Sequence, residues 1–458
     1  MNREALWSLR LGFSTAQQEQ IKNAGMEAFL NTSFSYKPKI VKPSFLDGLT
    51  MDLKSIKQHR KSFQQLTVEE KKIARKQQRM DLYSMTYDWI DRMQAAEYPL
   101  RENMTCFWHN HFVVTYGKVK VAPWIFEHQI ALYDGAFGNF RELTKSMVRS
   151  NAMISYLDNN KNRKDSNNEN LARELLELFT LGIGNYTEND IKAAAQALAG
   201  LGHGDGGGKY RKRLRETEPM TFMGETGVFD SDDIVTIIFE QPNAPYLITE
   251  KILKWFLYDD PSKEDVKKYE DFLRAVDYEM QPFLKQLFLE EFKKDAVAVK
   301  IKDPLRFALQ TLQELHLNDR IESEQIGRFL KEQSMELYNQ PNVKGWEGGQ
   351  SWLTSAIYLR RNQVARWLAA GERISNRKKM NRMRDPELPD LKIPKSLSTN
   401  KEIIAYLLDQ TLSVSTPVIQ SDLEEILKYD FKPHEPGSEL GILRAYTYII
   451  TTPEYQVI

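Results

Sequence analysis

The sequence has a single cysteine, Cys106, among 458 residues. One thiol can form neither an intramolecular disulfide nor a multi-cysteine zinc site, so both are excluded. No run approaches the ~18 to 20 apolar residues that a membrane-spanning helix needs, and the first residues lack the apolar core of a signal peptide. As written, the chain is expected in the cytoplasm, or in the periplasm or outside the cell if a leader has been removed.

The chain also has no excess of charge of either sign, because 63 basic residues balance 63 acidic ones. A nucleic-acid partner is therefore not expected, since the chain has neither a net positive charge that would attract one nor a recognised nucleic-acid-binding module. The apolar fraction of 41% and the charged fraction of 28% are ordinary for a globular protein. The expected partner is a small molecule or another protein.

Helical periodicity dominates what the sequence does contain. Apolar residues recur every three or four positions, as in the stretch from Thr67 to about Ala96, which predicts a long core helix that begins at Thr67. Alternating patterns are scarce. The best of them, Val113 to Val121, predicts either a short β-hairpin or an extended connection. The fold class is therefore all-α, a large multi-helix assembly.

Two stretches read as loops and are the candidate lobe boundaries. Residues 200–227 contain three consecutive glycines, and residues 377–396 contain three prolines. No period of about 20 to 50 residues, the mark of a solenoid, is present.

The densest cluster of polar and aromatic residues is Trp108-His109-Asn110-His111-Phe112. On a regular helix the two histidines lie roughly 200° apart and cannot bind one ion, whereas on an extended segment they share a face and could. One reading makes each a core histidine with satisfied nitrogens. The other makes them acid, base or metal ligands, with Trp108 and Asn110 as binding residues.

A second cluster lies on a predicted helix over residues 168–182, where polar residues form a line on an otherwise apolar helix. Its candidate site residues are Asn168, Glu169, Asn170, Arg173, Glu174 and Glu177. In one reading Glu174 and Glu177 pair with arginines of adjacent helices. In the other they converge with His109 and His111 as a catalytic set, with His109, His111 and Glu174 as ligands of a divalent metal. Glu-x-x-His, the mark of di-iron bundles, is absent.

A glycine-rich loop with two indoles forms a weaker signal further along the chain. Trp346 and Trp352 flank Gly348 and Gly349, and Arg361 follows on the next predicted helix. Both indoles are expected to be buried, with the turn at the mouth of the same polar site. Trp346 and Arg361 are added to the candidate binding residues.

Several of these segments resemble a bacterial family catalogued as domain of unknown function 1800. The matching motifs are Leu9-Arg10-Leu11-Gly12-Phe13, Phe107 to Phe112, Tyr156-Leu157-Asp158-Asn159, Asn168 to Leu178, Pro341 to Trp346, and Pro453-Glu454-Tyr455-Gln456. They extend over essentially the whole chain, which predicts one family unit over residues 1–458. The resemblance implies a helical protein that acts with a sulfatase-like protein encoded nearby.

The chain departs from that family's pattern at one place. Where members carry His-Asp and a lysine before a Thr-Phe-Leu-Gly-like turn, this sequence has Arg215, Glu216 and Met220. If the family's histidine and aspartate belong to its site, the site of this member is altered or inactive.

Two functions are compatible with these observations. The favoured one is a partner-binding or scaffold protein in which the His/Asn/Glu cluster holds long helices together. The alternative is a metal-dependent hydrolase or oxidoreductase that uses the same residues. Both require that the His109/His111 segment and the helix from Asn168 to Glu177 be neighbours in space.

Overall fold

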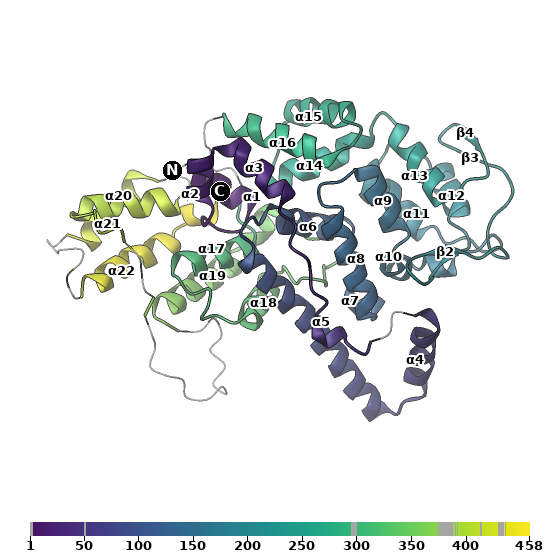
Figure 1. Cartoon of the computed structure of the whole chain (residues 1–458), viewed down its shortest axis with the longest axis horizontal. Helices are drawn as coiled ribbons and strands as arrows, with labels where there is room; N and C mark the ends of the chain where they lie inside the picture. Colours follow the sequence, from purple (N-terminus) through teal and green to yellow (C-terminus); the bar gives the residue numbers. More distant parts are fainter. Residues whose placement is uncertain are drawn as a thin grey trace.

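The computed structural model describes residues 3–49, 52–294, 300–372, 374, 388–389, 391, 393–412, 415–428, 435 and 437–458. These residues form twenty-two α-helices and two small two-stranded sheets, which confirms the all-α class (Figure 1). One contiguous hydrophobic core runs from Trp7 to Tyr455. No helix among the described residues combines the length and the apolar character needed to cross a bilayer.

The first helices lead into a long projection. They are α1 (Arg3–Leu11), α2 (Gln18–Ala24), α3 (Met26–Ser35), α4 (Leu53–Gln65) and α5 (Val68–Ala95). Thr67 caps α5 as predicted, because its hydroxyl accepts from the Glu70 amide while the Glu70 carboxylate accepts from the Thr67 amide. The expectation of a core helix is wrong for its first half, where Ile73 is 69% exposed and Met80 48% exposed. Figure 1 shows α4 and this half of α5 standing away from the body.

The middle of the molecule surrounds α6 (Leu100–His111), in which eleven of twelve residues are buried. Short helices follow it, and the chain then enters a segment that changes from α-helix to π-helix. These elements are α7 (Tyr116–Val119), α8 (Ala122–Asp134), α9 (Phe140–Val148), α10 (Asn151–Tyr156), α11 (Asn170–Glu174), the π-helix η3 (Leu175–Thr180) and α12 (Glu188–Ala197).

The strands lie in the segment predicted as a loop, and not at Val113 to Val121. That stretch contains the short helix α7, so the hairpin expected there is wrong. The strands are β1 (Leu201–Gly202), β2 (Lys209–Tyr210), β3 (Met220–Phe222) and β4 (Glu225–Gly227), paired antiparallel as β1 with β2 and β3 with β4. Met223 and Gly224 have φ values of 49° and 91°, the conformation that a tight two-residue hairpin turn requires.

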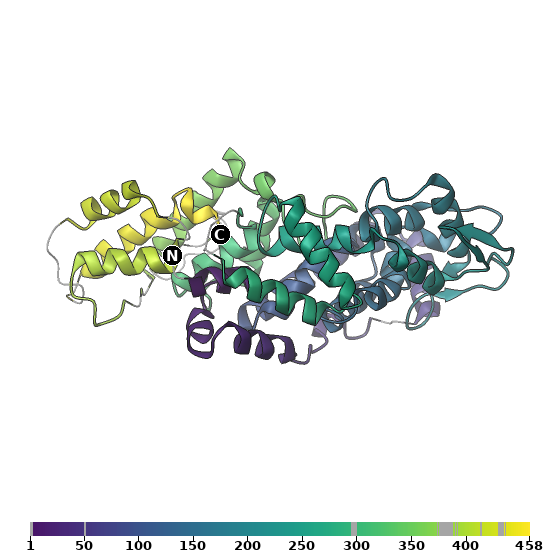
Figure 2. The ribbon, with the colours of Figure 1, turned by 90° about the horizontal axis from the view of Figure 1, so that it is seen from above.

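The remaining helices complete the two ends of the molecule. They are α13 (Ser231–Glu240), α14 (Ala244–Phe256), α15 (Lys263–Ala275), α16 (Met280–Phe292), α17 (Pro304–Glu314), α18 (Ser323–Glu332), α19 (Ser355–Ala369), α20 (Asn400–Thr411), α21 (Pro417–Ile426) and α22 (Ser438–Ile450). Figure 2 shows α20 to α22 at one end of the long axis and the strands at the other. The candidate boundary at residues 377–396 lies mostly outside the described residues.

Main-chain pairing ties segments that are far apart in sequence. The Lys300 amide donates to the Ile458 carbonyl at 2.9 Å, and the Ile458 amide donates back to Lys300 at 2.8 Å. Lys302 donates to Gln456 at 2.8 Å. Residues 300–302, which lead into α17, are therefore held by residues 456–458.

Candidate functional site

The two predicted histidines lie at the end of α6 and point to different neighbours. Because α6 is helical through His111, the two rings leave the helix in nearly opposite directions. The Nε2 of His109 accepts from the Tyr338 amide at 3.0 Å. His111 Nε2 lies 3.0 Å from the Phe179 carbonyl oxygen. The extended geometry that would let both bind one ion is not present.

The contacts of His111 determine which of its nitrogens carries the proton. A carbonyl oxygen can only accept, so Nε2 must donate to Phe179. Nδ1 is then free to accept, and the Lys251 ammonium lies 3.3 Å from it. Burial, together with the nearby charge of Lys251, lowers the pKa of His111 well below its usual value. His111 is therefore neutral, with both ring nitrogens hydrogen-bonded.

Lys251, on α14, is a site residue that the sequence analysis missed. Its Nζ donates to the Leu178 carbonyl at 2.8 Å as well as to His111. Burial lowers the pKa of Lys251 to about 8. The sequence did hold a signal, because Lys251 lies three residues after Ile248 and four before Trp255, on the apolar side of α14.

The carbonyls that Lys251 and His111 bind lie at the end of the π-helix η3. The last carbonyls of any helix lack an intrahelical partner, and those of Leu178 and Phe179 lie in the last turn of η3. Both side chains can donate to these free carbonyls, and the carbonyl dipoles also favour the positive charge of Lys251 at that end of a helix. The contact joins α6, α14 and η3.

His111 thus contacts Phe179, two residues beyond the predicted segment that ends at Glu177, and Glu174 and Glu177 are not part of the contact. The hydroxyl of Tyr186 donates to Glu177 at 3.1 Å. Glu174 is half-buried and lies near Lys344 and Tyr156. The predicted pairing with arginines of adjacent helices is wrong, since no ion pair of either carboxylate occurs among the described residues.

The residues around the start of α11 lie at the surface of the protein. The side chain of Asn168 accepts from the Asn170 amide at 3.0 Å, which caps the turn. Arg173 bridges Glu169 and Glu188, at 3.1 Å to each. These residues of the predicted binding set therefore face solvent, where ion pairs contribute little to stability.

Asn110 holds the glycine-rich loop against α6. Its side-chain oxygen accepts from the Trp346 amide at 2.7 Å. The Gln340 side chain donates to the His109 carbonyl at 2.9 Å. With the bond from Tyr338 to His109, residues 338–346 are pinned along the end of α6.

A pocket of about 360 Å³ opens beside this contact. It is lined by Phe107, Asn110, His111, Leu247, Glu250, Lys251, Lys254, Trp255, Asp259, Lys300, Lys344, Trp346, Glu347, Gly348, Gly349 and Trp352. Trp346 and Trp352 are buried, 5% and 4% exposed. The prediction that their turn lies at the mouth of the polar site is confirmed. Below we call this the Lys251 pocket.

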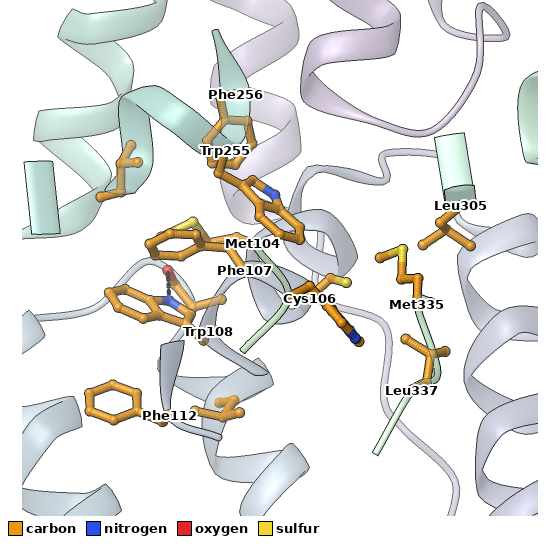
Figure 3. Packing of buried hydrophobic residues seen from close by; sticks show 14 of the residues in the cluster. Met104, Cys106, Phe107, Trp108, Phe112, Trp255, Phe256, Leu305, Met335 and Leu337 are labelled. Atoms are coloured by element: carbon orange, nitrogen blue, oxygen red, sulfur yellow. Dashed lines mark hydrogen bonds between the residues drawn. The ribbon is translucent and has the colours of Figure 1, made fainter. Parts of the chain in front are cut away.

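Trp108 supports the pocket without lining it. Its indole nitrogen donates to the Ala136 carbonyl at 3.1 Å. Phe107 contacts both Trp108 and Trp255, so the pocket wall continues directly into the hydrophobic core (Figure 3). The predicted role of Trp108 in binding is therefore indirect.

A family model described as Protein of unknown function (DUF1800) matches residues 4–457. The chain belongs to this family. The resemblance inferred from the motifs is thereby confirmed over essentially the whole chain. No curated protein and no solved structure matches it.

Arg215, Glu216 and Met220, the residues expected to differ from the family pattern, lie between β2 and β3 or in β3 of this DUF1800 chain. The Arg215 guanidinium lies 4.7 Å from the centre of the Tyr210 ring. The Glu216 carboxylate accepts from the amides of the next two residues, and Met220 is buried in β3. None of the three lines the pocket.

Two further predictions for this DUF1800 chain need correction. Arg361 is fully buried and donates to Gln333, Gln456 and the Lys302 carbonyl, so it belongs to the core around α17 and α19 and not to the pocket. His109, His111 and Glu174 do not assemble as metal ligands. Within the described ranges, no three His, Cys, Asp or Glu side chains are grouped as a metal ion would require.

The environment of Glu174 leads to a prediction for Glu174→Gln. Burial, followed by the charge of Glu177, raises the pKa of Glu174 above its ordinary value of 4.5. The folded state then holds this proton more tightly, so the free energy of unfolding falls as pH rises from 4.5 through the raised pKa. We expect Glu174→Gln to be at least as stable as the wild type at pH 7 and to lose that advantage at pH 4. Thermal melts at the two pH values measure this.

Glu177→Gln is the matched control, because an amide oxygen can still accept from Tyr186. A destabilisation of several kcal/mol by Glu174→Gln, as expected when a buried ion pair is broken, would contradict the assignment.

Proposed function

We propose that the protein binds a small ligand with an anionic group in the Lys251 pocket. The observation that supports this most directly is the Lys251 ammonium, which lines the pocket, donates to two neutral groups, the Leu178 carbonyl and His111, and forms no ion pair with a described residue. A buried charge is costly unless an opposite charge or several hydrogen bonds compensate it. An ammonium has three N–H donors, and a bound anion would occupy the third.

Two other lysines of the pocket are paired within the protein, and a third, Lys344, is exposed. Lys254 pairs with Glu250 at 2.9 Å. Lys300 lies 3.6 Å from Asp259 and also donates to the Lys254 carbonyl. Lys251 is thus the lysine of this pocket best placed to recognise an anion.

The aromatic side chains indicate what else the ligand carries. Three indoles, those of Trp255, Trp346 and Trp352, line the same pocket as Lys251. Indole faces bind the apolar faces of sugar rings and other flat groups. The ligand class that fits both features is a sugar, or similar ring, with a sulfate or phosphate monoester. This is also the kind of substrate that the sulfatase-like partner implied by the family resemblance would act on.

In this proposal His111 positions other groups and is not an acid or a base. Its two nitrogens are occupied and it is neutral at physiological pH, so its role is to hold Lys251 and the end of η3 in place. The scaffold function expected from the sequence is thus retained locally, as the support of a binding pocket.

Calorimetry with glucose 6-sulfate and glucose 6-phosphate, and with glucose as the uncharged comparison, tests the proposal. Lys251→Met should weaken binding of the esters about 10- to 100-fold, the effect of losing a charged hydrogen bond. Lys254→Met, on the same helix but paired with Glu250, is the matched control and should change affinity little. Equal losses in the two variants, or no binding of either ester by the wild type, would exclude the proposal.

The pH dependence of binding gives a separate prediction. The protonated form of Lys251 binds the anion, and its pKa is about 8. Affinity should therefore be nearly constant from pH 6 to 7.5 and fall about tenfold per pH unit well above 8. Lys251→Arg, whose guanidinium stays charged, should bind with no such decline. If the affinity of Lys251→Arg also fell above pH 8, the decline would come from the titration of a group other than Lys251.

A further inference from the structure

A second pocket, lined in part by α8, contains a hydrogen-bonded serine and histidine. His128 on α8 lies with its Nδ1 2.9 Å from the Ser150 hydroxyl. Its Nε2 lies 3.1 Å from the Phe112 carbonyl oxygen. A carbonyl only accepts, so Nε2 carries the proton, and Nδ1 must accept from Ser150.

This order of contacts is the one that nucleophilic catalysis requires. A hydroxyl donates to a basic nitrogen, and a third group fixes the tautomer and the orientation of the ring. Here the Phe112 carbonyl is that third group. Burial lowers the pKa of His128 to about 4, which keeps the ring neutral and Nδ1 unprotonated at neutral pH. Ser150 also caps α10 by accepting from the Met153 amide, which fixes its position.

Both residues line a pocket of about 480 Å³ that shares no lining residue with the Lys251 pocket. Trp124 and Met147 supply apolar wall, and residues 206–208, all glycine, form part of the rim. Lys209 lines the pocket too and forms no ion pair with any described residue. Its ammonium adds positive charge to the pocket lining, which would favour an anionic intermediate there.

We propose that Ser150 and His128 form an acyl-transfer site that hydrolyses small carboxylic esters with an apolar acyl group. The Ser150 oxygen bonds to the ester carbonyl carbon while its proton passes to His128 Nδ1. The carbon–oxygen bond to the alcohol then breaks, and the alcohol leaves with that proton. Water attacks the acyl-serine with His128 again accepting the proton, which releases the acid and restores Ser150.

A fluorophosphonate probe, which bonds covalently to activated serines, tests this on the full chain. We expect labelling at Ser150, found by mass spectrometry of the digested protein. Because Ser150 also caps α10, the test variant is Ser150→Asn, which preserves a side-chain cap without a hydroxyl. His128→Gln keeps the hydroxyl but removes the base, and should slow labelling at least about 100-fold. Circular dichroism establishes that both variants are folded.

Ser62→Ala is the control, since Ser62 is exposed on α4 and lines neither pocket. It should be labelled at Ser150 at the wild-type rate, and hydrolysis of p-nitrophenyl acetate should follow the same order among the variants. No labelling of the folded wild type, or unchanged ester hydrolysis in Ser150→Asn, would overturn the proposal. Neither result bears on anion binding in the Lys251 pocket.

Discussion

Replacing Gly345 with alanine is expected to destabilise the protein by roughly 2 to 5 kcal/mol and to abolish ligand binding in the Lys251 pocket. Gly345 has a φ of +85°, a conformation that costs alanine energy. A Cβ atom there would lie 2.3 Å from the side-chain oxygen of Asn110 and 2.6 Å from its carbonyl oxygen. The main-chain oxygen cannot move without distorting α6, so the loop must move away.

Gly348→Ala is the control that measures the cost of the backbone conformation alone, without a steric clash. Gly348 has a similar φ of +77°, but the nearest atom to an added Cβ is on Trp352 at 3.6 Å, an ordinary contact. It should cost only about 1 to 2 kcal/mol. Urea unfolding of the two variants measures the difference. Equal losses would show that the contact between Asn110 and the loop contributes nothing to stability.

Arg306→Met is expected to cost about 3 to 5 kcal/mol, because it leaves Asp303 as a buried charge without its partner. Arg306 is buried on α17 and forms an ion pair with Asp303. It also donates to the Leu9 carbonyl at 2.9 Å and to the Asn103 side chain at 3.1 Å. One guanidinium therefore joins α1, α6 and α17, and denaturant unfolding should reveal its loss.

Two comparisons separate the buried charge from the lost packing. Arg328→Met breaks an ion pair with Glu324 that is partly exposed, so it should cost less than about 1 kcal/mol. The double variant Asp303→Asn with Arg306→Met removes both charges and should recover part of the stability. If the double variant were less stable than Arg306→Met, the cost would lie in the hydrogen bonds to α1 and α6 rather than in the charge on Asp303.

The helices were predictable because their signals are local. The cap at Thr67 and the apolar periodicity that follows are properties of a few neighbouring residues, and α5 begins where they indicate. Periodicity identifies an apolar face but not whether another helix covers it. Ile73 and Met80 fit the pattern and yet are exposed in the first half of α5.

The candidate site was only half predictable for the same reason. His111, Asn110 and Trp346 come together as expected, but Lys251 comes from a distant helix and is recognised only from its contacts. Glu174 and Glu177 were assigned to the site on the assumption of a regular helix. The π-helix that begins at Leu175 widens the turn and changes which side chains face inward. The local sequence pattern did not predict this change from α-helix to π-helix.

The pairing of residues 300–302 with residues 456–458 can form only late in the synthesis of the chain. Lys300 lines the Lys251 pocket, and its main chain is held by Ile458. On the ribosome, α6, α14 and the glycine-rich loop emerge well before residues 456–458, at a rate of about 5 to 20 residues per second. Until those residues emerge, Lys300 lacks its main-chain partner and one wall of the pocket is unfinished. Ligand binding in the Lys251 pocket should therefore depend on residues 456–458, although none of them lines that pocket.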